Sequence, residues 1–156
     1  MYGIFSPIFC MTQADALDIL KTGVNVFLTG EPGAGKSYTV REYVKFLQSR
    51  GISPAMTAST GIAATHIGGM TIHSWSGLGI RKNITHRECK ELGANATYAR
   101  RIKNTHVLII DEISMLDAAM LDSVDLVCRV IRNIDLPFGG IQIVLVGDFF
   151  QLPPVS

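Results

Sequence analysis

Cysteine is scarce in this sequence, and the few that occur form no pattern. Cys10, Cys89 and Cys128 are far apart, odd in number and without C-x-x-C spacing, which excludes a disulfide scaffold and a zinc site and fits a reducing compartment. Charge is also scarce. Only 17 % of the residues are charged and the net charge is +1, which argues against disorder. With 47 % hydrophobic residues, the 156-residue chain can bury one core, so we expect one domain.

A long apolar run is missing as well. The opening MYGIFSPIFC lacks the basic n-region of a signal peptide, is interrupted by Pro7 and is too short to cross a bilayer. We therefore predict neither a signal peptide nor a membrane partner. Met11 would serve equally well as the first residue of the chain. We therefore expect residues 1–11 to be an N-terminal extension or a remnant of expression, and residues 12–156 to form the domain.

The charges that are present are unevenly distributed. Between Arg81 and Lys103 lie seven basic residues and two acidic ones. Such a segment is compatible with a solvated polar face and, equally, with a contact to nucleic acid. Composition alone leaves both interpretations open.

The apolar pattern alternates between buried strands and amphipathic helices. Unbroken apolar runs are typical of parallel strands covered on both faces, and here they occupy residues 24–30, 106–111 and 141–146, with a weaker one at 52–59. Helical spacing appears in residues 12–23 after a possible Thr12 cap, in residues 40–51 and after Asp117. We also expect short helices in residues 60–78 and one helix around residues 99–103. This order predicts an α/β fold, a central parallel sheet flanked by helices.

The stretch GEPGAGKS at residues 30–37 matches G-x-x-x-x-G-K-[ST] between a predicted strand and a predicted helix. Its glycines let backbone amides surround phosphate oxygens without Cβ clashes, and the helix start adds its positive end. We assign Lys36 to the β- and γ-phosphates of ATP and the Ser37 hydroxyl to Mg²⁺. The predicted nucleotide-binding residues here are Gly30, Gly33, Ala34, Gly35, Lys36, Ser37 and Tyr38. The alternative, a glycine-rich turn without a ligand, fits the flanking strand and helix less well.

Two carboxylates end the predicted strand LIIDE at residues 108–112. Asp111 is the natural second ligand of the Mg²⁺ assigned to Ser37. Glu112 follows at a position from which it can orient or deprotonate a water that attacks the γ-phosphate. A glutamate here favours hydrolysis over transfer of the phosphoryl group to a small molecule.

Five further motifs occur in a characteristic order: ASTGIAA (58–64), TIHSW (71–75), DEISML (111–116), PFGGIQ (137–142) and GDFFQLPPV (147–155). Together with the phosphate loop they closely resemble the first motor domain of the petite-integration-frequency family of DNA helicases, which belong to superfamily 1B and are relatives of RecD. The resemblance covers nearly the whole chain from about Thr12. It implies a RecA-like P-loop domain and an ATP-dependent 5′→3′ DNA helicase.

The resemblance also implies roles for individual residues. Gln13 lies where such helicases read the adenine edge of ATP. Gln151 resembles the residue that senses the γ-phosphate and couples it to the strand-binding cleft, and an amide can both donate and accept there. We therefore place Gln151 with Lys36 and Glu112 among the catalytic candidates.

The same resemblance implies contacts with single-stranded or forked DNA. Thr60 and Gly61 resemble the segment that contacts the strand backbone, where a hydroxyl and a glycine amide can approach phosphates. His73 and Trp75 lie where the family contacts the strand, and a tryptophan can stack on a base. A single tryptophan is equally often part of a core, so both alternatives remain open for Trp75.

In the family, the chain continues after the last motif into a second RecA-like domain that supplies an arginine finger. We therefore expect the 156 residues to be an N-terminal motor lobe that binds nucleotide with little turnover, in an intracellular protein (cytoplasmic in a bacterium, nuclear or mitochondrial in a eukaryote). The family's work in DNA repair, recombination and telomere maintenance is implied in the same way. The alternatives are another P-loop ATPase or kinase, and a non-catalytic single-strand-binding module.

Overall fold

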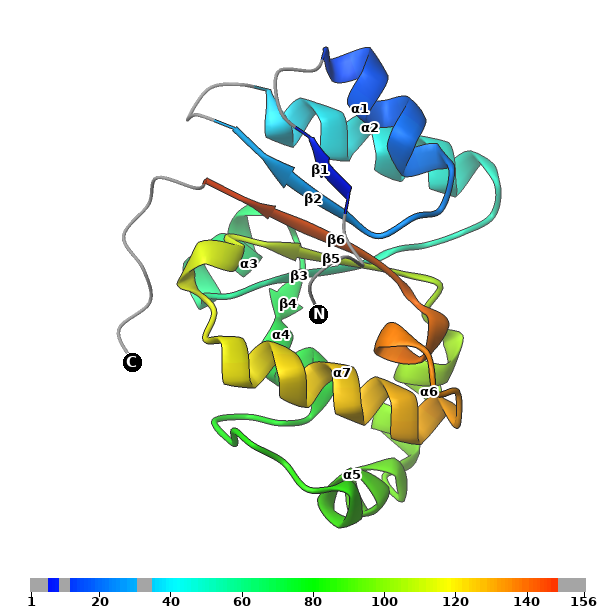
Figure 1. The fold of residues 1–156 in the computed structure, drawn as a ribbon, viewed down its shortest axis with the longest axis vertical. Helices are drawn as coiled ribbons and strands as arrows, with labels where there is room; N and C mark the ends of the chain where they lie inside the picture. The colour runs from blue at the N-terminus through cyan, green and yellow to red at the C-terminus, as the bar shows by residue number, and fades with distance from the viewer. Residues whose placement is uncertain (1–5, 9–11, 31–34, 149–156) are drawn as a thin grey trace.

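A computed structural model describes residues 6–8, 12–30 and 35–148 (Figure 1). In these residues six strands form one sheet in the order β1-β2-β6-β5-β3-β4, and every pairing is parallel. The strands are β1 Ser6–Ile8, β2 Val26–Thr29, β3 Ala55–Ala58, β4 Met70–Thr71, β5 Val107–Asp111 and β6 Gln142–Gly147. The predicted α/β fold with a central parallel sheet is confirmed.

Helices cover both faces of this sheet (Figure 1). α1 (Gln13–Lys21) and α2 (Lys36–Ser49) pack on one face around Leu20, Tyr43 and Leu47. α7 (Ala118–Arg132) packs on the other, with α4 (Ile72–Ser76), α5 (His86–Gly93) and α6 (Ala96–Asn104) around it. The remaining elements are α3 (Gly61–His66) and two 3₁₀ turns, η1 (Ile113–Met115) and η2 (Pro137–Gly140). Parallel strands covered on both faces explain the unbroken apolar runs.

Capping residues set the helix starts. Thr12 and Asp117 accept from Asp15 N and Ala119 N, as the sequence predicts. The basic segment holds two helices rather than the one expected near residues 99–103. The additional helix, α5, begins with a capping box in which Thr85 and Glu88 satisfy each other's backbone amides.

Two short strands lie outside the predicted pattern. β4 has only two residues and pairs with β3, between the two short helices. β1 pairs with β2 through residues 6–8, inside the segment that was expected to precede the domain. At least these three residues therefore belong to the sheet. None of the helices in the described ranges is both long and apolar enough to cross a membrane.

Candidate nucleotide-binding site

The site lies at the carboxyl edge of the sheet, and the strand order determines which residues meet there. β6 lies between β2, which leads into the phosphate loop, and β5, which carries the acidic pair. Side chains alternate between faces along a strand. Val144 and Val146 of β6 point to the face that α1 and α2 cover, as do Val107 and Ile109 of β5. Asp148 and Asp111 continue these two series, which directs both carboxylates toward α2.

The start of α2 is open to an anion. Its N-cap, Gly35, has φ 84° and ψ 19°, a left-handed conformation that suits glycine, and no side chain caps the helix. The first turn has no acidic residue, so no carboxylate of that turn competes with a phosphate for the positive end of this 14-residue helix. A Cβ at Gly35 would come within 1.8 Å of the Gln13 Nε2 atom, so a larger residue would displace the Gln13 side chain in addition to the strain of the positive φ. The predicted helix start after the phosphate loop is therefore present, while residues 31–34 of the loop lie outside the described residues and phosphate binding remains a prediction.

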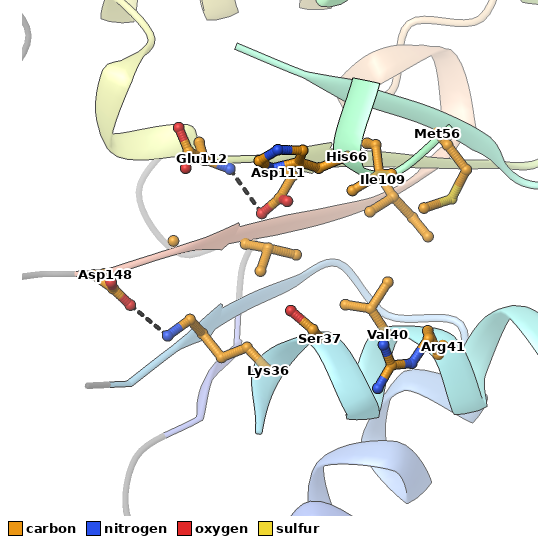
Figure 2. Close-up of a pocket in the computed structure, with 13 residues that line it drawn as sticks. Lys36, Ser37, Val40, Arg41, Met56, His66, Ile109, Asp111, Glu112 and Asp148 are labelled. Carbon is orange, nitrogen blue, oxygen red and sulfur yellow. Dashed lines mark hydrogen bonds and ion pairs between the residues drawn. The ribbon is translucent and has the colours of Figure 1, made fainter. Parts of the chain in front are cut away.

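Lys36 already contacts an anion of the protein itself. Its ammonium donates to the Gly30 carbonyl at 3.2 Å and forms an ion pair with the Asp148 carboxylate (Figure 2). The Lys36 and Asp148 side chains are 15 % and 10 % exposed. Asp148 is absent from the predicted site residues, although an acid directly after the glycine that ends β6 was a usable signal. What the sequence could not supply was the position of β6 beside β2.

The backbone of the acidic pair is held by hydrogen bonds. Glu112 N donates to Asp111 Oδ1 at 2.9 Å. Ser59 N donates to Asp111 O at 3.1 Å, and Ser59 Oγ donates to Glu112 O at 2.7 Å. Glu112 has φ 52° and ψ 47°, which a residue with a Cβ adopts only under local constraint. In Figure 2 the Asp111 carboxylate faces the cavity and that of Glu112 points away from Ser37.

Gly147 lets η1 approach the sheet directly behind Glu112. A Cβ at Gly147 would come within 2.9 Å of Ile113 Cγ2 and 3.3 Å of Ile113 N. Gly147, the glycine of the GDFFQ motif, is therefore required for packing, because Ile113 of η1 occupies the space that a Cβ would need.

These groups line one cavity of about 470 Å³, a size suited to a small ligand. Lys36, Ser37, Asp111, Glu112 and Asp148 form its polar part. Its other lining residues were not predicted as site residues: Val40, Arg41, Met56, His66, Ile67, Ile109, Val146 and Gly147. His66, from the end of α3, thus lines the same cavity as Asp111 and is labelled in Figure 2.

The residues present fit a nucleotide with Mg²⁺. The open helix start and Lys36 suit phosphates, and the Ser37 hydroxyl and Asp111 carboxylate are the hard oxygen ligands that Mg²⁺ prefers. No group of three or more His, Cys, Asp or Glu side chains that could hold a metal occurs in the described ranges. Mg²⁺ is usually bound by one or two protein oxygens together with substrate phosphates, so this small donor set is the expected one.

Residues 11–156 match the family of PIF1-like helicases. This chain belongs to that family. It is 58 % identical to the ATP-dependent DNA helicase Pif1 of Psychrobacter sp. (strain PRwf-1) over 146 residues, which are 94 % of this chain and 22 % of that protein. The chain thus spans about a fifth of that relative's length.

Solved structures of the PIF1-like family have the same fold. The crystal structure of Pif1 helicase from Candida albicans superposes with a TM-score of 0.84 at 41 % identity, covering 96 % of this chain and 34 % of that one. Pif1 helicase from Bacteroides, in complex with ADP-AlF3 and ssDNA, superposes with a TM-score of 0.77 at 31 % identity, again over 96 % and 34 %. The RecA-like fold of this PIF1-like chain is confirmed.

Two predicted nucleotide contacts lie beside the loop. Gln13 is exposed in the first turn of α1, with its amide against Gly35. Tyr38 is 49 % exposed on α2, next to Ser37. Their contacts with a nucleotide remain predictions. Gly33, Ala34 and Gln151 lie outside the described residues, so the roles assigned to them remain predictions too.

The segment predicted to contact the strand backbone lies at the same edge of the sheet. Thr60 caps α3 by accepting from Ala63 N at 3.2 Å, and Gly61 is exposed with open space around its Cα. Both come after Ser59, whose amide and hydroxyl bond to the carbonyls of the acidic pair. DNA contact by Thr60 and Gly61 remains a prediction.

Trp75 is part of the core. Its side chain is 2 % exposed and packs in the cluster beneath α7, so in this conformation the indole cannot stack on a base, and the core alternative holds. His73, two residues earlier, is only partly buried. Burial lowers the pKa of the His73 imidazole, and the positive charge of Lys82 lowers it further. Strand contact by His73 remains a prediction.

Several side chains of the basic segment form hydrogen bonds or ion pairs with other groups of this domain. Arg101 donates to the Ser74 and Trp75 carbonyls at 3.1 and 3.0 Å, and its guanidinium lies over the Tyr98 ring. Other basic residues of the segment bond to backbone carbonyls or carboxylates: Arg81, Lys82 and Arg87. These contacts account for four of the seven basic residues and do not decide between a solvated polar face and a contact to nucleic acid.

Proposed function

We propose that this chain is the N-terminal, ATP-binding motor lobe of a DNA helicase that hydrolyses ATP to move 5′→3′ along single-stranded DNA and unwind duplex. The observation that carries the proposal is the meeting of the start of α2 with the ends of β5 and β6 in one cavity. The open start of α2, the Lys36–Asp148 pair and the Asp111–Glu112 pair all line it, in a chain of the PIF1-like family. The relatives, which include an ATP-dependent DNA helicase and a Pif1 helicase in complex with ADP-AlF3 and ssDNA, support the ATP-dependent helicase activity.

Each residue has a role that its chemistry supports. The Lys36 ammonium and the amides at the start of α2 bind the phosphates. Ser37 and Asp111 would hold Mg²⁺, which when bound neutralises phosphate charge. Glu112 accepts a proton from the attacking water after its side chain turns into the cavity. Thr60, Gly61 and His73 contact the strand, and Gln151 senses the γ-phosphate.

A second RecA-like domain completes the site in this proposal. Tyr38 and Ser37 are exposed beside the cavity, which leaves room for a second wall. An arginine finger is worth on the order of 10³ to 10⁵ in rate in related nucleotide hydrolases. The 156 residues alone should therefore bind nucleotide with little turnover, and fast DNA-stimulated hydrolysis by them would contradict this part of the proposal.

Nucleotide binding by this chain tests the proposal. Lys36→Ala should weaken binding of ADP·Mg²⁺ by at least about 100-fold, because it removes a charge-assisted contact to phosphate in a partly buried site. Isothermal titration calorimetry measures this. Lys45→Ala is the matched control, since Lys45 is on the same helix, is 71 % exposed and pairs only with Glu42 among the described ion pairs. Equal affinities of the two variants would contradict the assignment.

A further inference from the structure

We infer that Ser59 is a positioning residue that links the strand-contact segment at Thr60–Gly61 to the carboxylate of Glu112. The inference rests on the proposed function and adds a route by which DNA binding reaches the hydrolytic site. Nothing about the side chain of Ser59 itself suggests catalysis. Its importance lies in the two backbones that it joins.

Ser59 uses both of its donors on the acidic pair. Its amide donates to Asp111 O at 3.1 Å, which extends the β3–β5 ladder by one bond beyond the last strand residue. Its hydroxyl donates to Glu112 O at 2.7 Å. Ser59 is 7 % exposed, so water competes poorly for these bonds. The position of Ser59 therefore determines where the Glu112 peptide lies.

Glu112 needs such a restraint. A residue other than glycine in the left-handed region is strained, and the surrounding structure has to hold it there. The Glu112 amide and carbonyl also bond to Asp111 Oδ1 and Met115 N, both within the same short segment. Among the hydrogen bonds of the described residues, the Ser59 hydroxyl is the one that reaches Glu112 from another strand. It is thus the bond through which movement elsewhere can reorient Glu112.

The other end of this link is the predicted strand contact. Thr60 is joined to Ser59 by one peptide bond and starts α3, a helix of only six residues. Thr60 is extended, with φ −129° and ψ 157°, while the helix begins at Gly61, which has no neighbour within 4 Å of a Cβ built on it. A phosphate bound by Thr60 and Gly61 would shift the start of α3. The shift would pass to Ser59 and from its hydroxyl to the Glu112 carbonyl.

A neighbouring residue provides a matched control for an ordinary structural bond. Thr57 lies on β3, two residues before Ser59, and faces the same way because side chains alternate along the extended chain. Its hydroxyl donates to Ile109 O at 2.7 Å, and the residue is fully buried. Thr57→Val removes a β3–β5 hydroxyl bond of the same length without touching the acidic pair.

The test measures ATP hydrolysis by the full-length protein that contains this sequence, with and without saturating oligo(dT). In Ser59→Ala we expect the DNA-stimulated kcat to fall about tenfold, the rate equivalent of one hydrogen bond to the Glu112 backbone. We expect the KM for ATP and the affinity for oligo(dT) each to change less than about threefold, because phosphate and strand contacts are intact. The basal rate should also change less than about threefold, because without DNA the Glu112 carboxylate points away from Ser37 even with the Ser59 bond in place (Figure 2). Ser59→Thr keeps the hydroxyl and should retain most of the stimulation.

The control separates coupling from general loss of stability. Thr57→Val should lower the unfolding temperature about as much as Ser59→Ala and leave the stimulation by DNA near that of the parent protein. The inference is overturned if Ser59→Ala keeps its stimulation, if basal and stimulated rates fall in proportion, or if Thr57→Val loses stimulation equally. A parent protein that neither binds nor hydrolyses ATP would overturn the proposed function itself, a result distinguishable from these three.

Discussion

Replacing Asp148 with asparagine should lower the stability of the nucleotide-free protein to unfolding and raise its affinity for ADP. Asp148 pairs with the Lys36 ammonium, the group assigned to the phosphates (Figure 2). In the free protein the carboxylate supplies the negative charge that phosphate oxygens would otherwise bring. Asparagine keeps an acceptor of similar size but removes the charge. The substitution should therefore destabilise the nucleotide-free state, and it should affect the bound state less because phosphates pair with Lys36 there.

The extent to which the Lys36–Asp148 ion pair is buried determines how much stability Asp148→Asn should lose. Removing one partner of a buried ion pair costs about 3–5 kcal/mol, and an exposed pair is worth about 0–1 kcal/mol. The Lys36 and Asp148 side chains are 15 % and 10 % exposed beside an open cavity, and Lys36 keeps the Gly30 carbonyl. We therefore expect a loss of about 2 kcal/mol, or roughly 4–8 °C in unfolding temperature for a domain of this size. If phosphates replace the lost charge, ADP affinity rises by up to about 30-fold, the equivalent of 2 kcal/mol.

Thermal unfolding with and without ADP, together with calorimetric titration, measures both effects. The matched control is Asp135→Asn, since Asp135 pairs with Arg129 but its side chain is fully exposed, so neither quantity should change. Weaker or unchanged ADP binding by Asp148→Asn would refute the reasoning. It would mean that Asp148 keeps its contact with Lys36 in the bound state.

Two further predictions concern the scaffold of the site, and chemical denaturation measures both. Tyr43→Phe should lower the free energy of unfolding by about 1–3 kcal/mol. The Tyr43 hydroxyl donates to the buried Gln142 Oε1 at 2.6 Å, and the substitution would leave that acceptor unsatisfied. A loss of stability no greater than that of Tyr98→Phe would contradict this prediction. Arg132→Lys should cost about 2 kcal/mol, because an ammonium cannot replace a guanidinium that bonds four carbonyls, those of Gly139, Ile102, Lys103 and Thr105. A cost as small as that of Arg100→Lys, at an exposed position, would count against this explanation.

The sequence predicted what local patterns determine. Unbroken apolar runs indicated β2, β5 and β6, and the capping residues Thr12 and Asp117 indicated the starts of α1 and α7. The start of α2 at Lys36 was predictable because the spacing of the phosphate-loop motif places a helix start directly after its last glycine. These features depend on residues close together in the chain.

The sequence could not predict what distant pairings determine. Asp148 meets Lys36 only because β6 lies beside β2, and Ser59 meets Glu112 only because β3 pairs with β5. From the sequence, Trp75 was equally compatible with the core and with stacking on a base, and only the three-dimensional structure places it in the core cluster. A two-residue strand such as β4 has no periodicity to detect.

The central claim is that the start of α2 binds the phosphates of a nucleotide. Amide NMR of the isotope-labelled chain during titration with ADP·Mg²⁺ tests it most directly. The account predicts large, saturable shifts of the Gly35, Lys36 and Ser37 amides, with smaller ones at Asp111, and their loss in Lys36→Ala. Signals of these three amides that stay in place while nucleotide binds elsewhere would contradict the account.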